Sequence, residues 1–192
     1  MTLPASANAR LRQFEDLLLR WNATLNLIAV RDSAVVWHRH IKDSLQLVAL
    51  MPAGIDRAID LGTGGGFPGL VLAIATGVRF DLIEADQRKA AFLRTAVLET
   101  GAPAMVHCCR IEDAAVHPAP LVTARALAPL PRLLPLAVRF VADGGVCLLL
   151  KGAKVEQELA QAAQDWTMSV DRIPSQTSAD GVVLRISGLA RH

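Results

Sequence analysis

Residues 58–69 join an apolar, acid-bearing strand segment to a glycine-rich turn, and this run constrains the fold more than any other part of the chain. Gly62, Gly64 and Gly66 alternate along the turn, so the backbone can bend tightly and approach a ligand without Cβ clashes. An apolar helical segment follows at 70–75, and its first N–H groups point toward whatever lies above the turn. A strand, a glycine turn and a helix in this order are typical of nucleotide-binding α/β proteins.

Two carboxylates flank this turn, and their positions favour one class of ligand. Asp60 lies two residues before the first glycine, where it would repel a pyrophosphate but would suit a cationic, amine-bearing ligand. S-adenosylmethionine, which carries an ammonium and a sulfonium, is such a ligand. Glu84 ends the next predicted strand, 22 residues after Gly62, at the distance where such folds place a carboxylate on ribose hydroxyls. We therefore interpret the turn and both acids as an S-adenosylmethionine site.

The glycine pattern by itself also fits other proteins. Residues 64–69 satisfy G-x-G-x-x-G, the fingerprint of dinucleotide-binding dehydrogenases, and a turn of this kind can also bind no ligand. Asp60 argues against a dehydrogenase because its charge would oppose a pyrophosphate, and Glu84 would oppose a 2′-phosphate. The dehydrogenase and the ligand-free turn remain the alternatives to the S-adenosylmethionine interpretation.

The 192-residue chain is long enough for one α/β domain with a full core and short for two. It has no continuously apolar 18-residue run and no secretory-signal pattern over residues 1–8, so we expect neither a membrane span nor secretion. Cys108, Cys109 and Cys147 lack paired metal-ligand spacing, and the adjacent pair is predicted to lie on a strand, facing opposite sides. We expect reduced cysteines in a cytoplasmic, monomeric protein.

The periodicity of apolar residues predicts helices first and a sheet afterwards. Spacings of three and four predict amphipathic helices near 10–22 and from Trp37 to before Pro52, so residues 1–57 are expected to cap a sheet within a single domain, 1–192. Strands and helices then alternate, which is typical of a doubly wound, Rossmann-like α/β fold. The predicted strands are 58–61, 80–84, 105–109, 121–124, 146–151, 169–173 and 182–187, and the predicted helices between them are 70–75, 89–99, 133–141 and 154–164.

The last two predicted strands distinguish this sheet from that of a dehydrogenase. They are expected to pair as an antiparallel hairpin at the sheet edge, joined by the polar connection 174–181. Asp143, Gly144 and Gly145 are predicted to form the turn before the preceding strand. A seven-stranded sheet with a final hairpin is usual for methyltransferases, whereas dehydrogenases have six parallel strands.

Several further motifs resemble a single family. They are Arg20-Trp21-Asn22 with Leu25-Asn26-Leu27-Ile28, Arg39-His40-Ile41-Lys42-Asp43-Ser44-Leu45, the turn from Asp60 to Gly69, Val122-Thr123-Ala124-Arg125-Ala126 and Leu150-Lys151-Gly152. The resemblance extends from Leu17 to Gly152. The combination resembles the RsmG family, also called GidB, whose members are bacterial methyltransferases acting on small-subunit ribosomal RNA.

The resemblance implies an activity, a partner and a set of cofactor contacts. The implied reaction is N7 methylation of a guanine at position 527, in a decoding-region loop of 16S rRNA, and the implied partner is that rRNA or the small ribosomal subunit. Glu84 stands where the family more often has aspartate, and the carboxylate function is retained. The family's contacts map onto Gly62, Phe67, the Ile111-Glu112 pair and Arg125, so the full expected cofactor set is Asp60, Gly62, Gly64, Gly66, Phe67, Glu84, Ile111, Glu112 and Arg125.

The chemistry of guanine N7 requires no catalytic base, because N7 carries a free lone pair. The sequence agrees, since it has neither the Asn/Asp-Pro-Pro-Tyr/Phe motif of amine methyltransferases after the fourth predicted strand nor a Pro-Cys nucleophile pair. We therefore expect direct in-line displacement, promoted by holding the acceptor and the methyl group in line. Arg125 and Lys151 end two successive predicted strands and are the positioning candidates, because ligands bind beyond the carboxyl ends of such strands.

Basic residues gather in two segments although the net charge is only +2. Residues 120–155 carry five basic residues against one acid, and Arg31–Lys42 carries three basic residues and two histidines against one acid. His38 and His40 diverge on a helix, so no metal site is expected. The RNA-binding candidates are His40, Lys42, Arg125, Arg132 and Lys151.

Two further functions stay open from the residues alone. A small-molecule methyltransferase would use the same glycine turn and Glu84, and the basic segment around Arg125 argues against it. A non-catalytic RNA-binding or assembly module is the other, and the intact turn argues against that. Salt-sensitive rRNA affinity separates the first from our interpretation, and S-adenosylmethionine binding separates the second.

Overall fold

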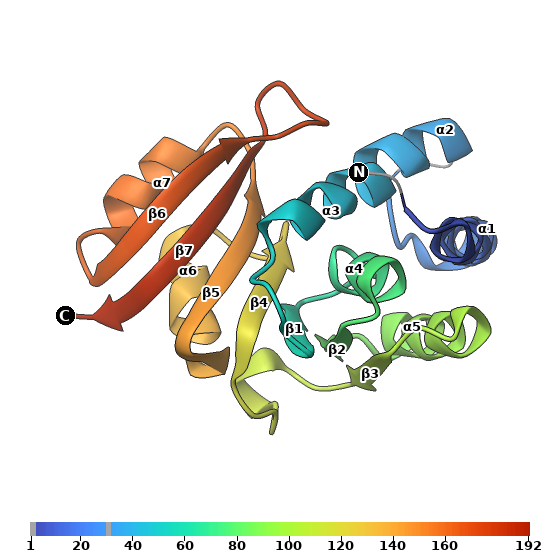
Figure 1. Ribbon diagram of the computed structural model, residues 1–192, viewed down its shortest axis with the longest axis horizontal. Helices are drawn as coiled ribbons and strands as arrows, with labels where there is room; N and C mark the ends of the chain where they lie inside the picture. Colours follow the sequence, from blue (N-terminus) through green and yellow to red (C-terminus); the bar gives the residue numbers. More distant parts are fainter. Residues whose placement is uncertain (1–2, 30–31) are drawn as a thin grey trace.

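The computed structural model describes residues 3–29 and 32–192, and its centre is one seven-stranded sheet (Figure 1). The strand order is β3-β2-β1-β4-β5-β7-β6. The first five strands are parallel, and β7 runs antiparallel to both of its neighbours. The predicted doubly wound α/β sheet with a final hairpin is therefore confirmed. The strands are β1 (Arg57–Leu61), β2 (Arg79–Ile83), β3 (Ala104–His107), β4 (Ala119–Arg125), β5 (Val141–Lys151), β6 (Trp166–Pro174) and β7 (Val182–Arg191).

Both faces of the sheet are buried under helices. In β5, Val146, Leu148 and Leu150 belong to one apolar cluster, while Cys147 and Leu149 belong to the other. Successive side chains of a strand point to opposite faces, so a continuous apolar run suits a strand covered on both sides. The first face is covered by α1 (Ala5–Leu25), α4 (Gly69–Thr76) and α5 (Gln87–Thr100), and the second by α6 (Leu130–Ala137) and α7 (Val155–Ala162) (Figure 1).

The N-terminal helix α1 packs on α4 and α5. The ring of Phe14 is fully buried there, with its centroid 5.6 Å from that of Phe67 and 6.3 Å from that of Phe92. The helix predicted near 10–22 lies within α1, which extends further at both ends. The apolar spacing of three and four thus found the buried stripe of the helix and not its ends.

The second predicted helix is present but changes its winding along its length. It consists of α2 (Ser33–Val36), a π-helical turn η1 (Trp37–Lys42), α3 (Asp43–Leu45) and a 3₁₀ turn η2 (Gln46–Leu50). It ends at Met51, whose backbone is extended, as expected for a residue before proline. The π-helical turn carries His40, and turns of this kind are frequent at functional sites.

Two local predictions are wrong. Strand β3 ends at His107, so Cys108 and Cys109 lie beyond the strand and lead into a 3₁₀ turn, η3 (Ile111–Asp113). The segment Asp143–Gly145 lies inside β5 and not in a turn before it, because β4 and β5 pair on both sides of an irregularity there. Glycine in a strand pattern often marks such an irregularity. Within residues 3–29 and 32–192, no helix has the length and apolarity that crossing a bilayer requires.

Candidate functional site

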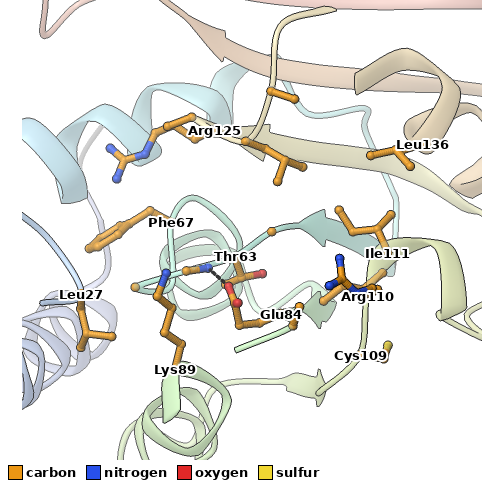
Figure 2. A pocket seen from close by; sticks show the side chains of 18 of the residues that line it. Leu27, Thr63, Phe67, Glu84, Lys89, Cys109, Arg110, Ile111, Arg125 and Leu136 are labelled. Atoms are coloured by element: carbon orange, nitrogen blue, oxygen red, sulfur yellow. Dashed lines mark hydrogen bonds between the residues drawn. The ribbon is translucent and has the colours of Figure 1, made fainter. Parts of the chain in front are cut away.

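The carboxyl ends of β1, β2 and β4 surround a cavity of about 730 Å³, here called the first cavity (Figure 2). Arg125 and Phe67 lie toward one end of it, Ile111 and Leu136 toward the other, and Glu84 lies between them (Figure 2). Ligands bind at this edge of open α/β sheets. The fold brings together at this cavity seven of the predicted cofactor residues, namely Gly62, Gly64, Phe67, Glu84, Ile111, Glu112 and Arg125.

The glycine turn needs glycine for two different physical reasons. Gly62 and Gly64 have φ of +64° and +59°, a left-handed conformation that other residues rarely adopt. A Cβ on Gly62 would lie 2.6 Å from Cδ1 of Leu127, whereas a Cβ on Gly64 would have no protein atom closer than 3.8 Å. Gly66 lies outside the lining of the first cavity, and its Cβ would stand 3.0 Å from Cζ of Phe14. Gly66 therefore serves packing beneath the turn and not the cavity.

Glu84 follows β2 directly, and its carboxylate links the glycine turn to the segment that begins α5. Its Oε2 accepts a hydrogen bond of 2.8 Å from the Gly64 N–H, and its Oε1 accepts one of 2.8 Å from the Asp86 N–H. Asp86 in turn caps α5 by accepting from the N–H groups of Arg88 and Lys89. A carboxylate has about four lone-pair sites, so Glu84 keeps acceptor capacity for hydroxyl groups in the cavity.

Asp60 does not line the first cavity, which corrects the prediction that it contacts the cofactor. Its side chain is completely buried behind the turn, where Oδ2 accepts from the Gly69 N–H at 3.1 Å and Oδ1 from Thr123 Oγ1 at 2.7 Å. Burial raises the pKa of Asp60 to about 6, against the opposing effect of these hydrogen bonds. Asp60 thus ties the start of α4 to β4 and supports the turn from below.

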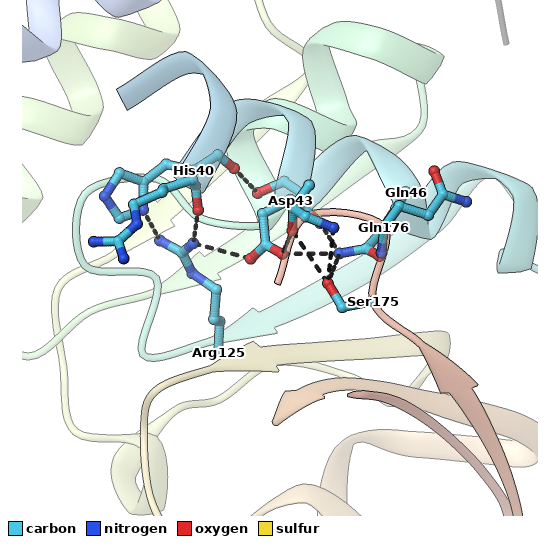
Figure 3. Close-up of polar contacts among 9 residues, drawn as sticks. His40, Asp43, Gln46, Arg125, Ser175 and Gln176 are labelled. Carbon is cyan, nitrogen blue, oxygen red and sulfur yellow. Dashed lines mark hydrogen bonds and ion pairs between the residues drawn. The ribbon is translucent and has the colours of Figure 1, made fainter. Parts of the chain in front are cut away.

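Arg125 is fixed by several partners at the end of β4 (Figure 3). Its Nη1 donates to the Arg39 carbonyl at 3.1 Å and to Asp43 Oδ2 at 3.2 Å, and its Nη2 lies 2.8 Å from His40 Nδ1. The guanidinium also lies over the Phe67 ring, 4.9 Å from its centroid. Arg125 therefore connects the glycine turn to the N-terminal helices.

The contact with Arg125 defines the tautomer and the protonation state of the His40 ring. A guanidinium can only donate, so His40 Nδ1 accepts and its proton is carried on Nε2. Burial, followed by the charge of Arg125, lowers the pKa of His40 to about 4, so the ring is neutral at physiological pH. The ring stacks on Phe67 with centroids 5.1 Å apart. His40 thus belongs to the Arg125 network, and its Nε2, which has no hydrogen-bond partner among the described residues, is buried and so not presented for the predicted contact with RNA.

The other predicted RNA-binding residues lie in different surroundings. The Lys151 ammonium lies 2.6 Å from Glu158 Oε2 and donates to the Ala128 carbonyl at 2.8 Å, so it is occupied within the protein. Arg132 is exposed and lines the first cavity. Lys42 is exposed in a separate hollow beside Trp37. Arg31, from the second basic segment, lies outside the described residues.

The sequence did not single out several residues that line the first cavity, among them Lys89, Arg110 and Leu127. Lys89 lies in the first turn of α5, Arg110 follows β3, and Leu127 follows β4 and closes on Gly62. The signal for Lys89 was available, because Asp86 is a good N-cap and places it in the helix turn next to Glu84. Across residues 3–29 and 32–192, no three His, Cys, Asp or Glu side chains come together as metal ligands would.

Comparison with known proteins identifies the family. A family model described as "GidB: rRNA small subunit methyltransferase G" matches residues 7–181. The chain is 54% identical over 184 residues to ribosomal RNA small subunit methyltransferase G of Acidiphilium cryptum, covering 94% of this chain and 85% of that relative. It is 50% identical over 190 residues to the protein of that name from Gluconobacter oxydans, covering 99% and 98%. The chain belongs to the GidB family of rRNA small subunit methyltransferases.

Solved structures share the fold at low sequence identity. An O-methyltransferase from Bacillus cereus in complex with SAH has a TM-score of 0.61 at 17% identity, covering 91% of this chain and 90% of that one. The O-methyltransferase TomG from Streptomyces achromogenes in complex with SAM has a TM-score of 0.57 at 15% identity, covering 91% and 89%. These likenesses establish a Rossmann-like methyltransferase fold.

Membership of the GidB family settles the coarse function. The family consists of S-adenosylmethionine-dependent enzymes that methylate small-subunit rRNA, so the predicted RsmG resemblance, enzyme class and cofactor are confirmed. The dehydrogenase, the small-molecule methyltransferase and the non-catalytic module are set aside on the same ground. Family membership does not give the roles of individual residues or the atom that is methylated, and these are proposed below from the geometry of the site.

Proposed function

We propose that the chain transfers the methyl group of S-adenosylmethionine to N7 of a guanine, at position 527 in the decoding-region loop of 16S rRNA, by direct in-line displacement. The observation that carries this proposal is that no imidazole or thiol among the described residues beside the first cavity is poised as a base, while the carboxylates that line the cavity, Glu84 and Glu112, are assigned to the cofactor. His40 is held as an acceptor by Arg125 with its pKa lowered to about 4, and burial raises the pKa of Cys109. An acceptor atom with its own lone pair, such as guanine N7, fits that setting.

The residues of the first cavity fit S-adenosylmethionine. Glu84 would accept hydrogen bonds from ribose hydroxyls with the lone pairs that Gly64 and Asp86 leave free. The turn at Gly62 and Gly64 presents backbone without side chains, and Phe67, Ile111 with Glu112, and Arg125 would supply the remaining contacts. Asp60 and Gly66 act from behind the turn. When bound, S-adenosylmethionine supplies a methyl group activated by its positively charged sulfur.

The chain contributes positioning and the exclusion of water. Arg125, fixed by Asp43, His40 and the Arg39 carbonyl, holds the end of β4 against the ring of Phe67. Leu127 closes on Gly62 and covers the inner edge of the turn. Because N7 needs no deprotonation, we assign no general base, and Arg125 is a positioning residue. Lys151 donates a hydrogen bond to the carbonyl of Ala128 and so holds this part of the cavity lining in place. We no longer assign Lys151 a contact with an RNA phosphate.

Contact with the rRNA backbone is assigned to exposed cations at the rim of the first cavity. Arg110 and Arg132 are exposed, line the cavity and have no ion pair with any described residue. Lys42 lies in a separate hollow, so it would contact the RNA only if the bound RNA extended beyond the rim of the first cavity. Phosphate contacts position an RNA without reading its sequence. We further propose that the protein works as a single-domain monomer in the cytoplasm, with residues 1–57 as the cap of the sheet.

A labelling experiment tests the proposed function. Small ribosomal subunits lacking the modification are incubated with the protein and S-adenosylmethionine that carries a heavy-isotope methyl group, and the rRNA is digested to nucleosides. We expect the label in N7-methylguanosine, and much less with Glu84→Ala. Label in a pyrimidine or in a guanine with a methylated exocyclic amine would refute the N7 proposal while leaving an rRNA methyltransferase.

A further inference from the structure

A second cavity of about 570 Å³ lies beside the first, at the carboxyl ends of β4 and β5. Arg125, Ala126, Leu127 and Ala128 line both cavities and form the partition between them. Ala126 has φ of +51°, a left-handed conformation that is rare outside glycine and that clusters at active sites. The segment that separates the two cavities is therefore held in an unusual conformation.

The connection between β6 and β7, residues 175–181, also lines the second cavity, and it is firmly held (Figure 3). Asp43 Oδ1 accepts from Thr177 Oγ1 at 2.5 Å, and Gln46 Oε1 accepts from the Gln176 N–H at 2.9 Å. The connection also closes on itself, since the Ser175 N–H donates to the Gly181 carbonyl at 2.9 Å. Asp43, which also holds Arg125, thus ties this connection to the partition.

The charged groups of the second cavity are paired with one exception. Arg125 pairs with Asp43, and Lys151 pairs with Glu158. Asp180 lines the same cavity, is exposed, and makes no hydrogen bond or ion pair through its side chain with any residue in 3–29 or 32–192. The cavity therefore offers one free carboxylate, on the β6–β7 connection.

We propose that the second cavity receives the guanine base that is methylated, and that Asp180 recognises it by accepting hydrogen bonds from its N1–H and its N2 amino group. This inference rests on the proposed function and adds the place of the target base. A planar pair of donors matches a carboxylate, and enzymes that act on bases read them through this edge after extruding them from the stack.

The shape of guanine agrees with this arrangement. N1 and the amino group on C2 belong to the six-membered-ring side of guanine, and N7 lies on the opposite side of the purine. With its N1 and C2-amino edge on Asp180, the guanine can turn N7 toward Arg125–Ala128, the lining that the second cavity shares with the first. Adenine presents an acceptor at N1 and no amino group at C2, so Asp180 would select against it.

The first test compares Asp180→Asn with Asp171→Asn, an exposed carboxylate on β6 of the same hairpin that pairs with Arg185 and does not line the cavity. We expect Asp180→Asn to lower kcat/KM for rRNA by about 10- to 100-fold, the size of losing a paired hydrogen-bond contact. The Kd for S-adenosylhomocysteine and the Tm should match those of Asp171→Asn. Equal kcat/KM for the two variants would overturn the proposal.

The second test changes the base. The target guanosine in a small-subunit rRNA is replaced by inosine, which lacks the N2 amino group and keeps N7. RNA affinity in the presence of S-adenosylhomocysteine should fall for the wild-type protein and should not fall further for Asp180→Ala. An unchanged inosine penalty in that variant would contradict recognition by Asp180. The nucleoside formed by the wild-type protein tests the N7 proposal separately, because this comparison measures RNA binding and needs no methyl transfer.

Discussion

The Nη1 atom of Arg125 lies 3.2 Å from Oδ2 of Asp43, although 82 residues separate them in the sequence. Both side chains are largely buried, with 17% and 14% of their surfaces exposed, so each charge depends on the other. The pair links the end of β4, where both cavities begin, to the helix that holds the β6–β7 connection. One ion pair therefore sets the relative position of both walls of the proposed target site.

Replacing Arg125 by lysine keeps the charge and removes the planar fork. A lysine cannot reach Asp43, His40 and the Arg39 carbonyl together, so we expect Arg125→Lys to lower the rate of methyl transfer by about 30- to 1,000-fold, or roughly 2–4 kcal/mol. Single-turnover kinetics on small subunits measure this. Arg172→Lys, at an exposed pair with Glu156, is the control and should retain the wild-type rate. Equal rates for both variants would show that Arg125 has no positioning role.

Gly64→Val tests the glycine turn as part of the cofactor site. The new side chain would project into open space beside Gly62, so it should abolish S-adenosylmethionine binding by filling the first cavity. Gly101 is a matched control, because its φ of +61° is close to the +59° of Gly64 and it ends α5 away from the cavity. Gly101→Val should cost similar stability, about 1 kcal/mol or more, with calorimetric binding intact. Undiminished binding by Gly64→Val would remove the turn from the site.

Asp60 and His40 should give opposite dependences of stability on pH in the same window. Burial raises the pKa of Asp60 from 3.8 to about 6, so between these values the folded chain holds a proton that the unfolded chain releases. This contribution makes stability fall as pH rises. Burial lowers the pKa of His40 from 6.5 to about 4, so there the unfolded chain holds the extra proton, and stability rises with pH.

Urea unfolding between pH 4.5 and 6.5 separates the two groups. Asp60→Asn should make the free energy of unfolding rise more steeply with pH than in the wild-type protein, by about 2 kcal/mol over the window. His40→Gln should change the slope in the opposite direction, because the remaining contribution of Asp60 makes the free energy of unfolding fall as pH rises. If the free energy of unfolding had the same pH dependence in all three proteins, neither Asp60 nor His40 would have the shifted pKa that its burial implies.

Local patterns made the fold and the first cavity predictable from the sequence. The glycine turn, Glu84 and the alternation of strands and helices depend on neighbouring residues, so their positions followed from spacing. The changes of winding in the second N-terminal helix could not be predicted in this way, because within a single turn the apolar spacing of α, π and 3₁₀ helices is almost the same. The end of β3 at His107 could not be predicted either, because the apolar residues continue into Cys108 and Cys109 without a break.

The errors in the site concern charges whose partners lie far away in the sequence. The sequence shows that Asp60 is acidic and close to the turn, but its burial behind the turn depends on Thr123 in β4. Lys151 resembled a phosphate ligand until its pairing with Glu158 of α7 was visible. Asp180 lay in a polar connection without any motif, and only the packing of β6 and β7 beside β5 brings it to a cavity.

The most direct measurement of the central claim is the position of the modified base in 16S rRNA. N7-methylguanine becomes labile after reduction, and aniline then cleaves the chain at that nucleotide. We expect one strong cleavage at position 527 in rRNA from cells that make the protein, and none there when the gene is deleted or encodes Gly64→Val. Identical cleavage patterns with and without the protein would contradict N7 methylation at that position.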